Sequence, residues 1–128
     1  MRVQLDPGAF MPEREHEQDA GMDLRTRERV VLRAHDSTIV DTGIHVEIPE
    51  GYAGILKSKS DLNIKFDIIG TGIVDAGYTD SIKVKLYNLG ALDHVFQAGD
   101  ALIQLVIFPV FADDLEQVDS LNSGNNNI

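Results

Sequence analysis

A chain of 128 residues without cysteine can form one domain with a single hydrophobic core, and it excludes disulfides, thiolate catalysis and thiolate metal sites. The formal net charge of −10 at pH 7 argues against binding along a nucleic acid polymer, which needs a basic face, but a small phosphate ligand carrying a divalent cation stays possible. No apolar run reaches the roughly eighteen residues of a membrane span, and the first residues lack a signal-peptide pattern, so we expect a cytoplasmic protein without membrane contact.

The first half of the chain is predicted to form short strands separated by polar turns. An alternating strand is expected over residues 1–5, and the charged stretch 12–19 is expected to be a solvated loop. Further strands are predicted over residues 20–25, 30–32, 37–41, 44–48 and 52–56. Asp23 and Arg25 are two residues apart on a strand and so share one face, which also fits a salt-bridged surface. Strands at this spacing, with almost no helical periodicity, are typical of an all-β sandwich or barrel.

The only helix is predicted over residues 60–66. Ser60 or Asp61 can cap its start, and Leu62 and Phe66 are four residues apart on what we expect to be its buried side. Free backbone N–H groups, a hydroxyl and two lysines converge at this start. The segment is therefore either an anion-binding site or a plain capped turn with solvated lysines.

Residues 70–82 predict a hairpin with a glycine-rich tip. Asp75 and Tyr78 lie three residues apart there, so a carboxylate can accept a hydrogen bond from a hydroxyl or a water while an aromatic ring lies flat against a sugar. An ordinary turn explains the same residues, with Asp75 and Gly77 shaping the bend and Tyr78 filling a gap.

The last part of the chain returns from this hairpin over residues 82–86 and then forms an apolar run over 101–111. This run predicts a strand that is buried on both faces, in the core or at a subunit contact. Gln104 interrupts it, and a buried amide must bond either nearby backbone or a ligand. Residues 1–120 are expected to form one domain, and residues 121–128 a flexible polar tail. The four histidines show no metal-ligand spacing, so no metal held by the protein is expected.

Five stretches, in this order, resemble the homotrimeric all-β dUTP pyrophosphatases (dUTPases). They are Ala-Gly-Met-Asp-Leu at 20–24, Gly-Ile-His-Val-Glu-Ile-Pro-Glu-Gly-Tyr at 43–52, Lys-Ser-Lys-Ser-Asp-Leu at 57–62, Gly-Ile-Val-Asp-Ala-Gly-Tyr at 72–78 and Gly-Asp-Ala-Leu-Ile-Gln-Leu-Val at 99–106. The similarity extends over nearly the whole chain. It implies a dUTPase-like β-barrel or jelly-roll, assembled as a homotrimer whose sites are shared between subunits.

The resemblance also implies a reaction, the hydrolysis of dUTP to dUMP and pyrophosphate with Mg²⁺ carried on the substrate's phosphates. Asp75 would activate the water that attacks the α-phosphorus. Tyr78 would stack under the deoxyribose, and the hairpin backbone from Gly72 to Lys83 would pair with uracil. Substrate contacts are implied for Lys59, Ser60, Asp61, Gly72, Ile73, Tyr78, Lys83 and Gln104. Asp23 and Arg25 would support the site, Asp23 through Mg²⁺-bound water or through a basic neighbour.

Several positions depart from the family pattern. Lys59-Ser60-Asp61 stands where the family usually has Arg-Ser-Gly, which loses the planar guanidinium fork and adds a carboxylate near the phosphates. Residues 121–128 lack the arginine and phenylalanine of the family's glycine-rich C-terminal arm, so slower turnover is expected. Two alternatives stay open: a dCTP deaminase-type enzyme of the same fold, and a dUTPase-like nucleotide-binding or regulatory protein with weak catalysis.

Overall fold

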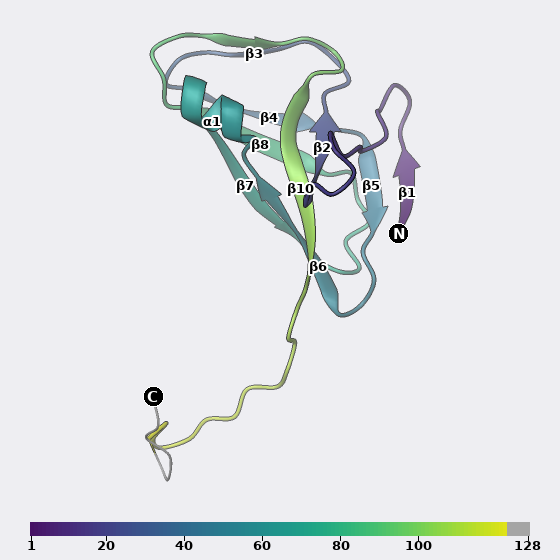
Figure 1. Cartoon of the computed structure of the whole chain (residues 1–128), viewed down its shortest axis with the longest axis vertical. Helices are drawn as coiled ribbons and strands as arrows, with labels where there is room; N and C mark the ends of the chain where they lie inside the picture. The colour runs from purple at the N-terminus through teal and green to yellow at the C-terminus, as the bar shows by residue number, and fades with distance from the viewer. Residues whose placement is uncertain (123–128) are drawn as a thin grey trace.

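Ten strands and one short helix form the described part of the chain, residues 1–122 of a computed structural model (Figure 1). The strands are β1 (Arg2–Leu5), β2 (Gly21–Arg25), β3 (Val30–Leu32), β4 (Ser37–Asp41), β5 (Ile44–Glu47), β6 (Tyr52–Lys57), β7 (Ile68–Val74), β8 (Lys83–Asn88), β9 (His94–Phe96) and β10 (Ala101–Pro109). The helix is α1 (Ser60–Phe66). The predicted all-β class and the predicted helix over residues 60–66 are confirmed.

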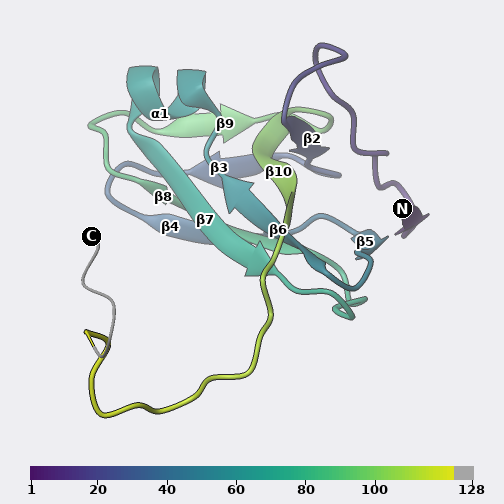
Figure 2. The ribbon, with the colours of Figure 1, turned by 60° about the horizontal axis from the view of Figure 1, so that its bottom comes forward.

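Six of the strands form one antiparallel sheet in the order β2-β10-β6-β7-β8-β4. Two further antiparallel pairs, β1 with β5 and β3 with β9, complete the fold. The large sheet curls like a half-barrel, so that β4 and β8 lie behind β6 and β7 in Figure 2. This curled sheet agrees with the predicted β-barrel or jelly-roll class.

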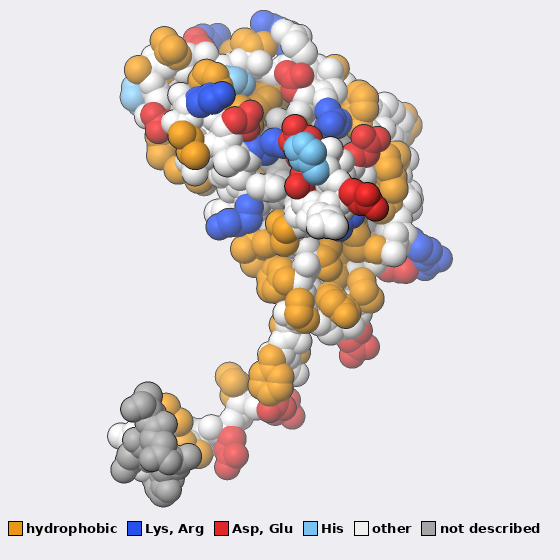
Figure 3. Space-filling view, viewed as in Figure 1, with side chains coloured by type: hydrophobic (Ala, Val, Ile, Leu, Met, Phe, Trp, Pro, Cys, Tyr) orange, Lys and Arg blue, Asp and Glu red, His pale blue; other side chains and the backbone are white. Residues whose placement is uncertain are grey.

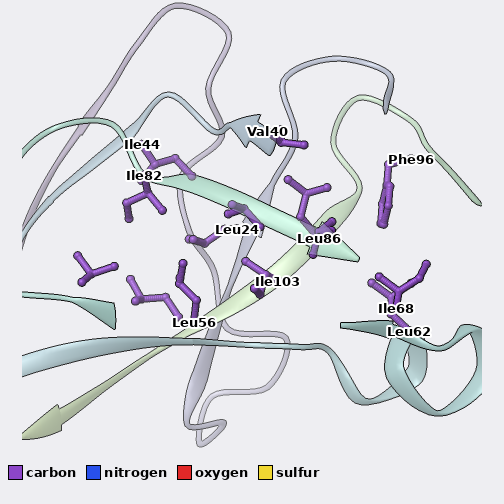
Figure 4. Packing of buried hydrophobic residues seen from close by; sticks show 14 of the residues in the cluster. Leu24, Val40, Ile44, Leu56, Leu62, Ile68, Ile82, Leu86, Phe96 and Ile103 are labelled. Atoms are coloured by element: carbon purple, nitrogen blue, oxygen red, sulfur yellow. The ribbon is translucent and has the colours of Figure 1, made fainter. Parts of the chain in front are cut away.

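The hydrophobic core fills the space that the curled sheet encloses. In β8, Val84 and Leu86 are buried while the lysines that alternate with them are exposed, as expected for a strand with one face in the core. Leu86 joins Leu24 of β2 and Ile103 of β10 in one buried cluster (Figure 4). Full burial of each such side chain contributes about 1.5–3 kcal/mol, so contacts between distant strands hold the sheet in its curled form.

The core of one chain takes only part of the apolar run over 101–111, which the sequence predicts to be buried in the core or at a subunit contact. Leu102, Ile103 and Leu105 are buried, but the rest of β10 is half-buried or exposed. A register shift between Ala101 and Ile103 breaks the simple alternation along the strand, which allows two successive side chains to be buried. Beyond Leu105 the strand covers the core with one face only.

The prediction that Phe66 lies on the buried side of α1 is wrong. Leu62 is buried, but Phe66 is 43% exposed. The helix ends at Phe66 because Asp67 takes the left-handed conformation, with φ of 54°. The Phe66 ring then lies against the ring of His94, with 5.0 Å between their centroids, rather than in the core.

The chain leaves the body of the domain after β10. The Val110 N–H donates to the Gly51 carbonyl at 2.9 Å, and residues 111–122 then run away from the sheet (Figures 1 and 2). Most of the predicted polar tail over 121–128 lies outside the described residues, which end at 122. Within residues 1–122, no helix is both long enough and apolar enough to cross a membrane.

Candidate active site

One cleft of about 520 Å³, beside the start of α1, brings together six of the predicted site residues. They are Asp23, Arg25, Lys59, Ser60, Asp61 and Gln104. The rest of the lining comes from Glu15, Asp19 and Gly21. Residues from three separate stretches of the sequence therefore meet at one place, although none of these stretches identifies a site by itself.

The pairing of three strands positions the polar side chains in this cleft. β10 lies between β2 and β6, and Gln104 pairs with Asp23 on one side and with Lys57 on the other. Directly opposed residues of an antiparallel ladder share a face, so Gln104 and Asp23 face the cleft together. The Gln104 amide Nε2 donates to the Ser58 carbonyl at 3.3 Å, so this amide bonds nearby backbone.

Two of the lining side chains form an ion pair. The Lys59 Nζ donates to the Asp23 Oδ1 at 2.7 Å and lies 3.9 Å from the Glu15 Oε2. Asp23 is 7% exposed, so its carboxylate depends on this partner for compensation of its burial. The basic neighbour that the sequence offers as one possible partner of Asp23 is therefore Lys59.

The start of α1 differs from the predicted cap. Lys59, with extended backbone, is the N-cap residue, and no side chain of the cap bonds the first helical N–H groups. Ser60 is already inside the helix, and the Asp61 Oδ1 accepts only from the N–H of Leu62, at 3.0 Å. The prediction that Ser60 or Asp61 caps the helix is wrong. The chain stays extended through Lys59, whose side chain is paired with Asp23, and the helix begins after it.

A second, smaller cleft of about 240 Å³ adjoins the first and shares Arg25, Lys59 and Asp61 with it. The Arg25 Nη1 donates to the Gly99 carbonyl at 2.9 Å, which holds the guanidinium between the two clefts. His94 lines the smaller cleft, and its ring lies 4.6 Å from the Phe96 ring. The sequence predicts His94 only as a surface or turn residue.

Negative charge exceeds positive charge in the main cleft. Its lining holds four carboxylates, from Glu15, Asp19, Asp23 and Asp61, and two cationic groups, from Arg25 and Lys59. A phosphate chain that enters the cleft would meet net repulsion unless it brought a counter-cation with it. The charge balance therefore favours an anionic ligand that carries a divalent metal ion over a free anion.

The glycine-rich hairpin opens instead of pairing along its whole length. The β7–β8 ladder ends at Gly70 opposite Leu86. Beyond that point β7 pairs with β6 as far as Val74, whereas β8 pairs with β4 as far as Lys83. The inner backbone edges around Gly72, Ile73 and Lys83, which the sequence predicts to contact uracil, are thus not paired with each other.

A tight turn at the tip of the hairpin carries Asp75 and Tyr78. The Tyr78 N–H donates to the Asp75 carbonyl at 3.1 Å, and Gly77 has φ of 88°, the left-handed conformation that the third position of a type II turn requires. Both side chains are exposed, and the Tyr78 hydroxyl donates to the Ser81 carbonyl at 3.1 Å. The turn thus presents a carboxylate and a tied aromatic ring at the surface.

The hairpin tip and the cleft lie apart within one chain. Lys57 pairs with Thr71 and Gly54 with Val74, so Asp75 follows β7 at one end of β6 while Lys59 follows β6 at its other end. At ~3.3 Å per residue, the two are separated by on the order of 20 Å. One chain by itself therefore does not bring all the predicted site residues into one place.

The sequence did not identify one part of the cleft and one contact beside it. Residues 12–19, predicted as a solvated loop, fold back because the Asp23 N–H donates to the Glu13 carbonyl at 2.7 Å, and the loop adds Glu15 and Asp19 to the lining. Ser58 was also missed, although its Oγ accepts from the Gly70 N–H at 2.8 Å and joins β6 to β7. A lone serine between two lysines was the only sequence signal for that contact.

Comparison with known proteins gives a consistent result. A family model described as dUTPase matches residues 8–127. The deoxyuridine 5'-triphosphate nucleotidohydrolase of Clostridium acetobutylicum is 34% identical, and the match covers 94% of this chain and 86% of that protein. The protein of the same name from Mycobacterium marinum is 39% identical, over 94% of this chain and 80% of that protein.

Solved structures agree with these sequence matches. The dUTPase from phage phi11 of S. aureus superposes with a TM-score of 0.88 at 31% identity, over 95% of this chain and 97% of that one. The dUTPase of Staphylococcus bacteriophage 80alpha, described as controlling transfer of virulence genes, has a TM-score of 0.87 at 30% identity, over 95% and 97% of the two chains. As its motifs predict, the chain belongs to the dUTPase family.

Proposed function

We propose that this protein hydrolyses dUTP to dUMP and pyrophosphate. The observation that carries the proposal is that a chain matching the dUTPase family over residues 8–127 also gathers the expected phosphate-contacting side chains in one cleft. Hydrolysis at phosphorus depends mainly on positioning and on charge stabilisation, so it needs few catalytic side chains. Its curated relatives are named as nucleotidohydrolases of the same compound. Within residues 1–122, no structural feature favours the deaminase alternative.

Asp75 is the catalytic residue in this proposal. Its carboxylate takes a proton from the water that attacks the α-phosphorus, which requires an exposed and ionised group free to reach a bound ligand. The Tyr78 ring, held through its hydroxyl by Ser81, stacks under the deoxyribose. The open inner edges at Gly72, Ile73 and Lys83 offer backbone donors and acceptors to the uracil edge.

The cleft residues bind the triphosphate. Lys59, Ser60 and Gln104 donate to phosphate oxygens, with Arg25 in support, and Lys59 exchanges part of its contact with Asp23 for a contact with the ligand. Asp61 must turn outward, since its carboxylate otherwise repels the phosphates. The excess of carboxylates in the lining fits a substrate that arrives with Mg²⁺, because oxygen ligands and negative charge suit this cation. A mutant of the phi11 phage dUTPase has been solved with a coordinated structural Mg(II) ion.

We further infer that three copies assemble, so that the hairpin of one chain reaches the cleft of another. The separation of Asp75 and Lys59 within one chain requires a second chain if both act on one nucleotide. Apolar side chains gather where β6 and β10 meet the departing chain (Figure 3), including Tyr52, Val110 and Phe111, which are 46%, 39% and 89% exposed. Such a patch fits a subunit interface.

Product analysis tests the proposed reaction directly. The purified chain is incubated with dUTP or with dCTP in the presence of Mg²⁺, and released pyrophosphate and ammonia are measured separately. Pyrophosphate from dUTP alone supports the proposal, and addition of a chelator should abolish it without lowering the melting temperature. Ammonia from dCTP would identify a deaminase, and nucleotide binding without either product would identify a binding protein. A monomer by light scattering at working concentration would contradict the shared site.

A further inference from the structure

The segment between β7 and β8 that carries Asp75 and Tyr78 is fastened to β4 and β5 by polar contacts. Its end is fixed by backbone, since the Ile82 N–H donates to the Ile44 carbonyl at 2.8 Å. Its middle is held by two side chains. The Ser81 hydroxyl donates to the Asp41 carboxylate, and the His45 ring Nδ1 lies 2.7 Å from the Thr79 carbonyl. Thr79 directly follows Tyr78, so the His45 contact acts next to the proposed sugar-stacking ring.

His45 uses both of its ring nitrogens. Its Nε2 lies 2.9 Å from the Asp6 Oδ1, in the turn after β1, while its Nδ1 faces the Thr79 carbonyl. Both partners are acceptors, and only the protonated imidazolium ring carries two N–H donors. The His45 side chain is 21% exposed, so its ring is only partly shielded from water. This geometry therefore suits a charged ring that bridges β1 and the hairpin loop.

The charges around His45 act in the same direction. The hydrogen bond to the Thr79 carbonyl raises the pKa of His45 above its ordinary value, burial opposes the rise, and the Asp6 and Asp41 carboxylates add to it. Arg2 and Glu47 line the same small cleft but are paired with each other at 2.6 Å. Because the pKa is raised, both contacts are present at low pH, and one is lost as the pH rises through the raised value.

We propose that His45 is a positioning residue that holds the Asp75–Tyr78 turn in place when protonated and loosens it as the pH rises. The neutral ring has one donor, and the charged Asp6 carboxylate is a stronger acceptor than the Thr79 carbonyl. The neutral ring therefore keeps its proton on Nε2, and the lone pair of Nδ1 then faces the Thr79 carbonyl. The loosening reaches the turn through the Tyr78 hydroxyl bond to Ser81 and the Tyr78 N–H bond to Asp75. Only the effect on turnover depends on the proposed function; the contact itself does not.

Hydrogen exchange combined with a ring titration tests the contact on the full chain. The His45 protonation state is followed by NMR from mildly acidic to mildly alkaline pH, together with the protection of the Tyr78 and Ile82 amides, corrected for intrinsic exchange. Tyr78 protection should fall about fivefold, the factor of roughly one net hydrogen bond, as the ring loses its proton. Ile82 should not follow, because its bond to the Ile44 carbonyl involves no titrating group.

Three variants separate positioning from a general effect on folding. His45→Gln keeps a neutral donor and should give Tyr78 protection that no longer varies with pH. His45→Ala should give low protection at every pH. His35→Gln, in the exposed turn between β3 and β4, should keep the wild-type profile. A flat profile in the wild type, or the wild-type profile in His45→Ala, would overturn the proposal.

Kinetics with dUTP distinguish this proposal from the proposed function. The wild-type kcat/KM should fall through the pH at which the ring titrates, and His45→Gln should lack that fall. If the chain turns over dUTP but its Tyr78 protection does not vary with pH, the role of His45 is overturned and the proposed function stands. If Tyr78 protection varies with pH but the chain does not turn over dUTP, the proposed function is overturned and the role of His45 stands.

Discussion

Gly21 lies so close to Gln104 that the smallest side chain should change the cleft. A Cβ added at Gly21 would lie 2.2 Å from the Gln104 Oε1 and 2.9 Å from its Cδ. Carbon atoms do not approach this closely without a shift, so Gly21→Ala must turn the Gln104 amide out of its present place. The 3.3 Å bond from Gln104 to the Ser58 carbonyl would be lost with it.

The expected effect is large on activity and small on stability. If Gln104 donates to a phosphate oxygen, loss of that charge-assisted bond costs about 1.5–3 kcal/mol, which lowers kcat/KM roughly ten- to hundredfold. The long bond to Ser58 contributes about 1 kcal/mol or less, and alanine in place of glycine in a strand returns about 0.5–1 kcal/mol. The free energy of unfolding should therefore change little.

A double-mutant cycle provides the assay. Pyrophosphate release from dUTP is measured for the wild type, Gly21→Ala, Gln104→Ala and the double variant, with urea unfolding of each. If Gly21→Ala acts through Gln104, the double variant should be no slower than Gln104→Ala alone. The geometry and the assigned role of Gln104 would both be refuted if the losses of kcat/KM in the two single variants added in the double variant. They would also be refuted if Gly21→Ala, with its added methyl group verified, kept the wild-type kcat/KM.

Three further results are expected. Asp75→Asn keeps the backbone of its turn but removes the carboxylate, so turnover should fall at least about a hundredfold with unchanged melting temperature and nucleotide binding; full activity would contradict the assigned role. Asn88→Ala leaves the carbonyls of Leu32 and Leu92 without their buried donor, which should cost on the order of 2–4 kcal/mol in urea unfolding, whereas Asn63→Ala on the exposed side of α1 should be nearly neutral. The Ser81 hydroxyl lowers the pKa of Asp41, so the stability that this contact gives above the unfolded pKa of the carboxyl is lost as the pH falls through the folded pKa. The melting temperature of Ser81→Ala should therefore fall less on acidification than that of the wild type. An equal fall in both proteins would contradict this.

Much of the fold could be predicted because its signals are local. Each predicted strand in the first half of the chain is present, with its ends shifted by no more than one residue. The alternation of Val84 and Leu86 with lysines along β8 identifies its buried face without any knowledge of its neighbours. The polar stretch before Leu62 identified the helix correctly, although the residue that caps it depends on a contact with Asp23, which lies far away in the sequence.

The arrangement of the site could be predicted only in part, because it depends on pairing between distant strands. The hairpin opens beyond Gly70 because β7 then pairs with β6 and β8 pairs with β4, instead of with each other. Nothing within residues 70–82 indicates this change of pairing partner. The fold of the 12–19 loop over the cleft depends on a backbone bond to Asp23 and on the approach of Glu15 to Lys59, both of which join segments that the sequence pattern does not connect. Family motifs identified the cleft residues, but they could not indicate that Glu15 and Asp19 join them.

The surplus of carboxylates in the cleft also bears on how fast a ligand arrives. Proteins that bind phosphate compounds through basic surfaces attract them over long range, and added salt slows the encounter. Here the local surplus lies within a chain whose formal net charge is −10, so an anion is repelled during its diffusional approach. Added salt should then speed association. A metal ion that binds the nucleotide before contact lowers the nucleotide's negative charge, so metal binding should also speed its capture.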